Sequence, residues 1–369
     1  MKHLSVLDGI RGWAIIFVML YHFTIPFQQM NGLTYADVII AKILQMGWLG
    51  VDLFFVMSGF LITNILLRSS DKPNYYRNFY IRRFLRIFPL YYGLLILFLV
   101  IFPFLSDSLA AKTANMQENS FWFWTYLVNW KIASLGTFEG FQSGYMWSLA
   151  IEEQFYIFWP LFLRFFYNRL ITVSVLLLVM SFILKLIGLY LGASGTTLYT
   201  MTFTHVDGLI LGSIFGILYW QEKLSILTIK KLGVAAFLSI LLSSIIAFIT
   251  KGFVFYNAIV GSIGVTLASI TFTYILVKSL KTERKYIFLK DAFVMKCGQL
   301  CYGLYLLHQP ISVMVSERVL SPVAFQFNGS YILSMLLNVC LSLSLSFLIA
   351  MLSYKYYELP FLKLKKYFT

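Results

Sequence analysis

Long apolar runs, separated by short polar segments, dominate the hydrophobic pattern of this chain. About 20 apolar residues in a helix are enough to cross the hydrocarbon core of a bilayer once. The pattern predicts ten crossings, over residues 8–28, 47–67, 84–104, 145–166, 171–191, 204–220, 231–249, 255–278, 297–316 and 331–356. The chain is therefore predicted to be an all-α membrane protein, a polytopic bundle of about ten transmembrane helices formed by one domain over residues 1–369.

The composition supports this class. Hydrophobic residues make up 60% of the chain, charged residues only 12%, and the mean hydropathy is +0.80, values that exclude an ordinary soluble globule. The first apolar run lacks a small-residue cleavage site, so it is interpreted as a retained span and not as a signal peptide.

The basic residues are distributed unevenly between the two sides of the predicted bundle. The formal net charge is +14, and 23 of the 29 lysines and arginines fall on the side that holds both termini. Six are expected on the other side, namely Lys42, Lys112, Lys131, Lys185, Lys251 and Arg318. This bias follows the positive-inside rule, so both termini are predicted to be cytoplasmic and the lipid bilayer, not nucleic acid, explains the charge.

The stretch from Leu7 to His22 combines an apolar run with ionisable residues. Arg11 and His22 are eleven residues apart, which on an ideal helix places them on roughly the same face, about 16 Å apart. With Arg11 at one interface, His22 lies near the middle of the bilayer, where an ionisable side chain is costly. Such a histidine needs a hydrogen-bonding partner, a wet cavity or a catalytic role.

Two further spans carry carboxylates, and Asp52 and Tyr156 in these spans are candidate substrate-binding residues. Asp52 lies early in the second span, where it requires a cation or a polar pocket, whereas Ser58 in the same span is expected to serve helix packing. In the fourth span Ser148, Glu152 and Tyr156 follow one another at intervals of four residues and form a polar stripe on one helix face. Glu152 is predicted to point inward, and Glu153, turned about 100° away, to cap the helix or face water.

A basic, aromatic segment precedes the third span. Arg82 and Arg86 are one helical turn apart, with Arg83 between them. Guanidinium groups bind phosphate oxygens well, so the segment is a candidate phosphate-binding site for coenzyme A. A purely topogenic role, or binding of lipid headgroups, explains the same residues and stays open.

The later spans add three candidate substrate-binding residues. His205 and Asp207 are expected near the outer interface, where a solvent-exposed histidine is as good an interpretation as a site residue. Glycines 208, 212 and 216 recur every four residues and predict close helix packing. His308 is expected in the middle of its span, just before the kinking residue Pro310. Cys297 and Cys301 lack the further ligands of a zinc site, so no metal is expected.

Taken together, these stretches resemble the acyltransferase-3 family of integral membrane acyltransferases. The resemblance is carried by the ordered set LDGIRGWAIIFVMLYHF, GWLGVDLFFVMSGFLIT, FYIRRFLRIFPLYY, MWSLAIEEQFYIFWPLF, the His-x-Asp-Gly stretch, YGLYLLHQPI and YYELPF. It implies an enzyme of the bacterial cytoplasmic membrane that moves an acyl group, usually acetyl, from cytoplasmic acetyl-CoA to a hydroxyl of a carbohydrate or glycolipid acceptor, often during assembly of envelope polysaccharides.

The resemblance also assigns roles. His22 matches the family's catalytic histidine and Arg11 its partner, Arg83 and Arg86 match the motif linked to donor handling, and Glu152 matches the acidic position. Two features depart from the family pattern: His205 stands where an arginine is expected, and no esterase-like domain follows Thr369. Direct transfer to the acceptor, a separate delivery partner, or a homo-oligomer would be compatible with that ending.

The residues alone leave two other classes of protein open, a transporter and a structural scaffold. In a proton-coupled transporter or exporter, His22, Asp52, Glu152 and His308 would form a proton relay, although no inverted repeat is visible. A structural scaffold is disfavoured because it has no need for buried ionisable residues. The sequence contains no glycine-rich phosphate loop, HExxH or GxSxG motif.

Overall fold

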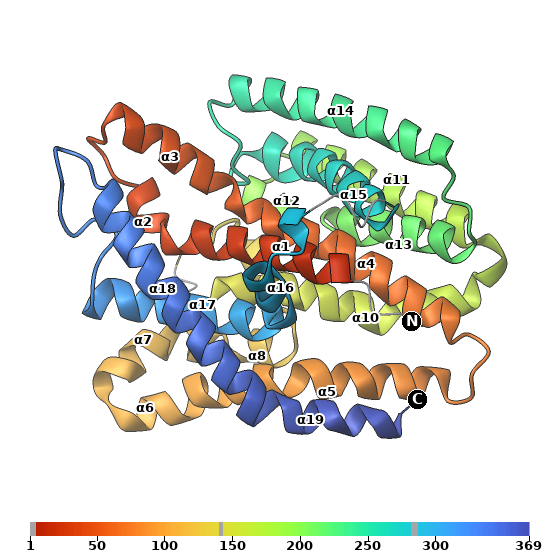
Figure 1. Ribbon diagram of the computed structural model, residues 1–369, viewed down its shortest axis with the longest axis horizontal. Helices are drawn as coiled ribbons and strands as arrows, with labels where there is room; N and C mark the ends of the chain where they lie inside the picture. Colours follow the sequence, from red (N-terminus) through yellow and green to blue (C-terminus); the bar gives the residue numbers. More distant parts are fainter. Residues whose placement is uncertain (1–4, 140–142, 282–286, 369) are drawn as a thin grey trace. The chain divides into compact units, whose positions relative to one another are not determined.

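The structure, a computed structural model, describes residues 5–139, 143–281 and 287–368 (Figure 1). In these ranges nearly all residues are helical and no strand occurs, apart from one isolated bridge between Phe327 and Ser330. Three basic residues of the predicted inner side, Lys2, Arg284 and Lys285, lie outside the described residues.

Each of the ten predicted spans is largely helical, although some include a break between two helices, and this confirms the all-α polytopic class. In the part of the chain that the structure describes, seven helical runs are long and apolar enough to cross a membrane: Val6–Phe23, Tyr35–Arg68, Tyr75–Leu105, Tyr167–Tyr190, Ile226–Ile249, Val260–Lys281 and Ile332–Tyr367. The helix Asp207–Trp220 is apolar but shorter. The number of crossings and their orientation stay predictions.

The chain divides into two compact units. The first comprises Met1–Phe54 and Lys278–Tyr357, and the second Phe55–Val277 and Glu358–Thr369. The helix α4 (Gly50–Arg68) runs from the first unit into the second.

Helix α1 (Ser5–Phe23) is the centre of the first unit. It packs against α16 (Ala292–Gln299), α17 (Cys301–Arg318) and the short 3-10 helix η1 (Met46–Leu49), while α17 lies beside α18 (Ile332–Ser353) (Figure 1). Helices α2 (Ile25–Gln28) and α3 (Tyr35–Gln45) also belong to this unit. Helix α1 is therefore held on several sides within its own unit.

Glycines bring α1 and α16 into backbone contact. A Cβ atom at Gly12 would lie 1.9 Å from the carbonyl oxygen of Val294, and one at Gly298 would lie 1.9 Å from that of Asp8. No side chain fits at such distances, so small residues set the helix separation here, as is common between membrane helices.

The second unit holds the other long helices. They are α5 (Tyr75–Ile96), α10 (Trp147–Phe165), α11 (Leu170–Tyr190), α13 (Asp207–Trp220), α14 (Ile226–Ile249) and α15 (Val265–Lys281). Shorter helices connect them, namely α6 (Phe102–Leu105), α7 (Asp107–Glu118), α8 (Ser120–Trp124), α9 (Val128–Leu135) and α12 (Gly195–Thr200). Two π-helical turns, η2 (Leu97–Ile101) and η6 (Val260–Gly264), continue directly into α6 and α15.

The predicted glycine packing is confirmed in this unit. A Cβ atom at Gly212 of α13 would lie 2.0 Å from the carbonyl oxygen of Val56, and one at Gly59 of α4 would lie 1.9 Å from that of Leu209. The aromatic segment after α7 packs on α5, where the rings of Tyr92 and Trp124 stack with their centroids 5.5 Å apart.

The C-terminal segment also belongs to the second unit. Helix α19 (Leu359–Lys363) and the 3-10 turn η9 (Leu364–Tyr367) lie along α5 (Figure 1). The segment that carries the last basic residues of the chain is therefore placed next to the arginines of α5.

Candidate active site

His22 and His308 lie together in the first unit. Nε2 of His308 is 3.2 Å from Nδ1 of His22, and the two ring centroids are 4.9 Å apart. His308 is fully buried in α17, whereas His22 near the end of α1 is only partly buried. The sequence predicted both residues as site candidates but not their contact.

The surrounding carbonyl groups determine which ring nitrogens carry hydrogen. Nδ1 of His308 lies 2.7 Å from the carbonyl oxygen of Tyr305 and 3.1 Å from that of Leu304. A carbonyl oxygen can only accept, so Nδ1 of His308 is the donor and the neutral ring keeps its lone pair on Nε2.

The same reasoning applies to His22. Its Nδ1 lies 2.9 Å from the carbonyl oxygen of Val18 and faces the acceptor Nε2 of His308. Nδ1 therefore carries the hydrogen, and the lone pair of the neutral ring is on Nε2. Among the described residues Nε2 of His22 makes no hydrogen bond. The arrangement leaves one basic nitrogen available for chemistry.

The other predicted residues of this unit occupy polar positions. Arg11 lies on α1 with His22, and its Nη1 is 3.6 Å from Oδ1 of Asp8, one turn before it. Asp52 is fully buried in α4. Their predicted roles in catalysis and substrate binding stay predictions.

Glu152 and Tyr156 of α10 meet through Ser58 of α4. The Tyr156 hydroxyl donates to the Ser58 oxygen at 3.2 Å, and the Ser58 hydroxyl donates in turn to Oε1 of Glu152. Two members of the predicted polar stripe, Glu152 and Tyr156, therefore face the same neighbour, Ser58, which the sequence interpretation had assigned to packing. Ser58 orients the Glu152 carboxylate through a hydrogen bond that comes from another helix. A role for Glu152 beside His22 stays a prediction.

Glu153 was expected to cap the helix or face water, and both alternatives are wrong, because it lies inside α10 (Trp147–Phe165) and is buried. Its side chain is only 5% exposed, and Oε1 has no hydrogen-bond partner among the described residues. The spacing places Glu153 away from Glu152, but the neighbouring helices cover this face as well. Arg83 of α5 lies within electrostatic reach of Glu153 and so provides a nearby positive charge.

The three arginines of α5 have different environments. The guanidinium of Arg83 lies over the rings of Tyr156 and Phe79, 5.6 Å and 5.8 Å from their centroids. Arg82 is exposed and donates from Nη1 to the carbonyl oxygen of Phe368 at 3.2 Å. Arg86 is partly buried and makes no hydrogen bond or ion pair with the described residues.

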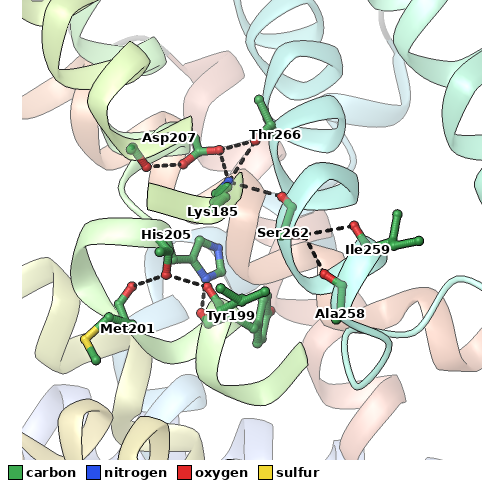
Figure 2. A network of polar contacts seen from close by, with 12 residues as sticks. Lys185, Tyr199, Met201, His205, Asp207, Ala258, Ile259, Ser262 and Thr266 are labelled. Carbon is green, nitrogen blue, oxygen red and sulfur yellow. Dashed lines mark hydrogen bonds and ion pairs between the residues drawn. The ribbon is translucent and has the colours of Figure 1, made fainter. Parts of the chain in front are cut away.

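A buried ion pair lies deeper in the second unit (Figure 2). Lys185 of α11 bonds the carboxylate of Asp207 on α13, and its Nζ also donates to Thr266 Oγ1 at 2.7 Å and to the Ser262 carbonyl at 3.1 Å. Thr266 and Ser181 donate to Asp207 as well. The side chain of Lys185, which the charge distribution assigned to the outer side, is fully buried in the protein, and its side of the membrane stays a prediction. The burial of a lysine within a long apolar run cannot be predicted from hydropathy, because hydropathy does not identify the carboxylate that pairs with it.

His205 is fully buried, so the solvent-exposed alternative is wrong. Its Nδ1 bonds the carbonyl oxygen of Tyr199, as Figure 2 shows, and the rings of Trp147, Tyr199 and Phe55 surround it with centroids 4.5–5.3 Å away. The contacts of His205 and Asp207 are typical of a structural network, and their predicted substrate-binding roles stay predictions.

A polar cluster around Gln154 was not predicted. Nε2 of Gln154 donates to Asn129 Oδ1 at 2.9 Å and to the Tyr126 carbonyl at 2.8 Å, while Thr202 and Trp130 donate to its Oε1. Gln154 is two residues after Glu152 and lies on another face of α10. An amide within an apolar helix is the only feature of the sequence that could have indicated it.

Many apolar helices and partly buried polar side chains define the class of this molecule as an integral, multi-pass membrane protein. The family model for the acyltransferase domain of the acyltransferase-3 family matches residues 4–355, so the chain belongs to this family. The match includes parts of both compact units.

Several curated proteins are similar to this chain. It is 27% identical to the peptidoglycan O-acetyltransferase OatA of Listeria monocytogenes over 98% of this chain and 56% of that protein. It is 33% identical to the putative peptidoglycan O-acetyltransferase YrhL of Bacillus subtilis over 61% of this chain and 34% of that protein. It is 26% identical to the O-acetyltransferase OatA of Staphylococcus aureus over 98% of this chain and 58% of that protein.

The chain therefore spans little more than half the length of the curated relatives that it matches end to end. No solved structure matches it significantly.

Proposed function

We propose that this protein is a membrane O-acyltransferase that moves an acyl group, acetyl in the first instance, from cytoplasmic acyl-CoA to a hydroxyl of a cell-envelope glycan. Family membership supports the reaction class. The names of the relatives support a cell-wall acceptor, and peptidoglycan is the first acceptor to test. The observation that carries the proposal is the imidazole of His22, whose two Nδ1 contacts leave the Nε2 lone pair available.

His22 is the proposed general base. As the acceptor hydroxyl oxygen bonds to the acyl carbon, Nε2 takes the hydroxyl proton, and the carbon–sulfur bond of the thioester breaks. The departing thiolate then recovers the proton from Nε2, so free thiol leaves and His22 is again neutral. If His22 carries the acyl group itself, the same nitrogen is the nucleophile.

His308 is the proposed positioning residue for this base. Its Nε2 accepts from Nδ1–H of His22, and this hydrogen bond fixes the ring orientation and the tautomer. The bond also stabilises the positive charge that develops on His22 while it holds the proton. The Tyr305 and Leu304 carbonyls hold His308 in the required tautomer in turn.

The arginines of α5 are proposed to bind the phosphate groups of the donor. Arg86 makes no hydrogen bond or ion pair with the described residues, although it is partly buried. A guanidinium carries five N–H donors, which match phosphate oxygens in pairs. Arg83, which lies over the Tyr156 ring, is oriented by that contact.

Glycan analysis tests the proposed function. The wild type and His22→Ala are produced in a host that lacks its own envelope O-acetyltransferase, and released cell-wall glycans are analysed by mass spectrometry. The wild type is expected to add the mass of one or more acetyl groups, and His22→Ala to add none while it inserts in equal amount. Unmodified glycans with the wild type, or normal acetylation with His22→Ala, would contradict the proposal.

A donor assay on isolated membranes separates the proposed enzyme from a transporter. Continued release of free thiol from acetyl-CoA, beyond one equivalent per protein, should require acceptor, whereas a transporter moves its substrate unmodified. Rapid acid quenching with radiolabelled acetyl-CoA distinguishes the two roles of His22, because only a carrier leaves labelled protein.

A further inference from the structure

The C-terminal segment adds a cation to the arginine face of α5. Lys365 in η9 is partly buried, and it lies close enough to Arg82, Arg83 and Arg86 for their charges to repel its ammonium group. All four residues belong to the second unit. Packing of α19 and η9 against α5 therefore places the positive charge of Lys365 close to the positive charges of the α5 arginines.

Part of this cluster has no counter-ion among residues 5–139, 143–281 and 287–368. Lys365 and Arg86 make no hydrogen bond or ion pair within the described ranges, and Arg82 makes one hydrogen bond, to the backbone carbonyl of Phe368. Arg83 differs from them because it lies near Glu153 and over the Tyr156 ring. Arg82, Arg86 and Lys365 are therefore a separate group of cations.

An anion would stabilise such a group. Arg86 and Lys365 are partly buried and lose some of their hydration, and the repulsion between the three cations, with Arg82 exposed beside them, adds to that cost. An anion with several oxygens would satisfy the fork of a guanidinium and the point charge of an ammonium at once, and a phosphate group has this chemistry.

We propose that Lys365, together with Arg82 and Arg86, forms a phosphate-binding subsite, and that it takes the phosphate groups of the acyl donor. The assignment to the donor rests on the function proposed above. The hydrogen bond from the Arg82 guanidinium to the Phe368 carbonyl oxygen connects the C-terminal segment to α5 and helps to keep Lys365 in place. The C-terminal segment thereby becomes part of donor recognition.

Binding measurements on the purified full chain in phosphatidylcholine nanodiscs test this subsite. The probes are coenzyme A and pantetheine, which lacks the phosphates. Lys365→Gln is expected to weaken coenzyme A binding about five- to tenfold, as loss of one charge-assisted contact predicts, and to leave pantetheine binding unchanged. The matched control is Lys366→Gln, because Lys366 is exposed and lies over the Tyr367 ring, 4.9 Å from its centroid. The control should bind both probes as the wild type does.

Equal coenzyme A affinity in Lys365→Gln and the wild type would overturn the subsite. An equal loss of pantetheine binding would overturn it too, because it would indicate a general structural defect. Nanodiscs with phosphatidylglycerol test the other source of phosphate. A further outcome is that anionic lipid raises the thermal stability of the wild type but not of Lys365→Gln, while coenzyme A raises the thermal stability of neither protein. In that case the assignment of the subsite to the donor is wrong.

The outcomes also separate this proposal from the proposed function. Binding of coenzyme A that depends on Lys365, in a wild type that transfers no acyl group, supports the subsite and contradicts the reaction. Acyl transfer by the wild type, with an unchanged KM for acetyl-CoA in Lys365→Gln, supports the reaction and contradicts the subsite.

Discussion

Nε2 of His308 accepts the hydrogen of Nδ1 of His22 across 3.2 Å, although 286 residues separate the two in the chain. The contact directs the remaining lone pair of His22 to Nε2. Helix α17 thus determines the chemistry available to a side chain of α1.

The first prediction concerns this contact. His308→Leu should lower kcat for acyl transfer about ten- to a hundredfold, because one hydrogen bond to a developing charge is lost, and should leave KM for the donor unchanged. His308→Gln keeps an acceptor in the amide oxygen and should recover part of kcat. The measurement is steady-state kinetics with both substrates varied.

Nitrogen NMR provides an independent readout of the tautomer. The chain contains four histidines, so selective ¹⁵N-histidine labelling gives few signals. In the wild type the signal lost in His22→Ala should have the shifts of a ring protonated on Nδ1. A ring protonated on Nε2, or equal kcat losses in His308→Leu and His308→Gln, would contradict the positioning role.

A second prediction concerns Ser58, which connects Tyr156 and Glu152. Ser58→Ala removes the donor to the carboxylate and should lower kcat about tenfold, since a hydrogen bond to a charged group contributes about 1.5–3 kcal/mol. Tyr156→Phe removes only the outer bond and should have a smaller effect. Ser174→Ala is the matched control, because Ser174 is buried on α11 and its hydroxyl has no hydrogen-bond partner among the described residues. Equal activities in all three variants would exclude a role for this chain of hydrogen bonds.

The local pattern of hydrophobic and polar residues was sufficient to predict the helices and, in some of them, which residues share a face. A helix satisfies its own backbone polar groups, so every long apolar run predicts one in a membrane. The spacing of Glu152 and Tyr156 correctly predicted a shared face, because this spacing is fixed within one helix.

Contacts between distant segments could not be predicted in the same way. Ser58 and Glu152 are 94 residues apart, and an isolated serine in an apolar run has the same appearance whether it packs or donates. Lys185 is similar, because a lysine near the end of a span can extend its amine to the interface or bury it against a carboxylate. Only the position of Asp207 decides between these alternatives.

The third prediction concerns the close contact of α1 and α16. Gly12→Ala places a Cβ atom 1.9 Å from the Val294 carbonyl oxygen, so the helices must separate. Overpacking of this kind costs about 1–3 kcal/mol, and the yield of monodisperse protein and its thermal stability in detergent should both fall. Gly252→Ala is the control, because nothing lies within 4 Å of the added atom. Unchanged stability in Gly12→Ala would show that this contact is looser than the structure indicates.

The last prediction concerns the ion pair of Lys185 and Asp207, both fully enclosed in the second unit. Lys185→Met or Asp207→Leu alone leaves a buried charge without its partner, which costs about 3–5 kcal/mol, whereas an apolar pair of similar volume is often neutral. The double variant should therefore be more stable than either single variant in thermal unfolding, and Lys230→Met, at an exposed lysine, should match the wild type. If the double variant is stable but inactive, the pair has a role beyond folding. If the losses simply add, the two residues are not coupled, and the network of Figure 2 does not stabilise the fold as a unit.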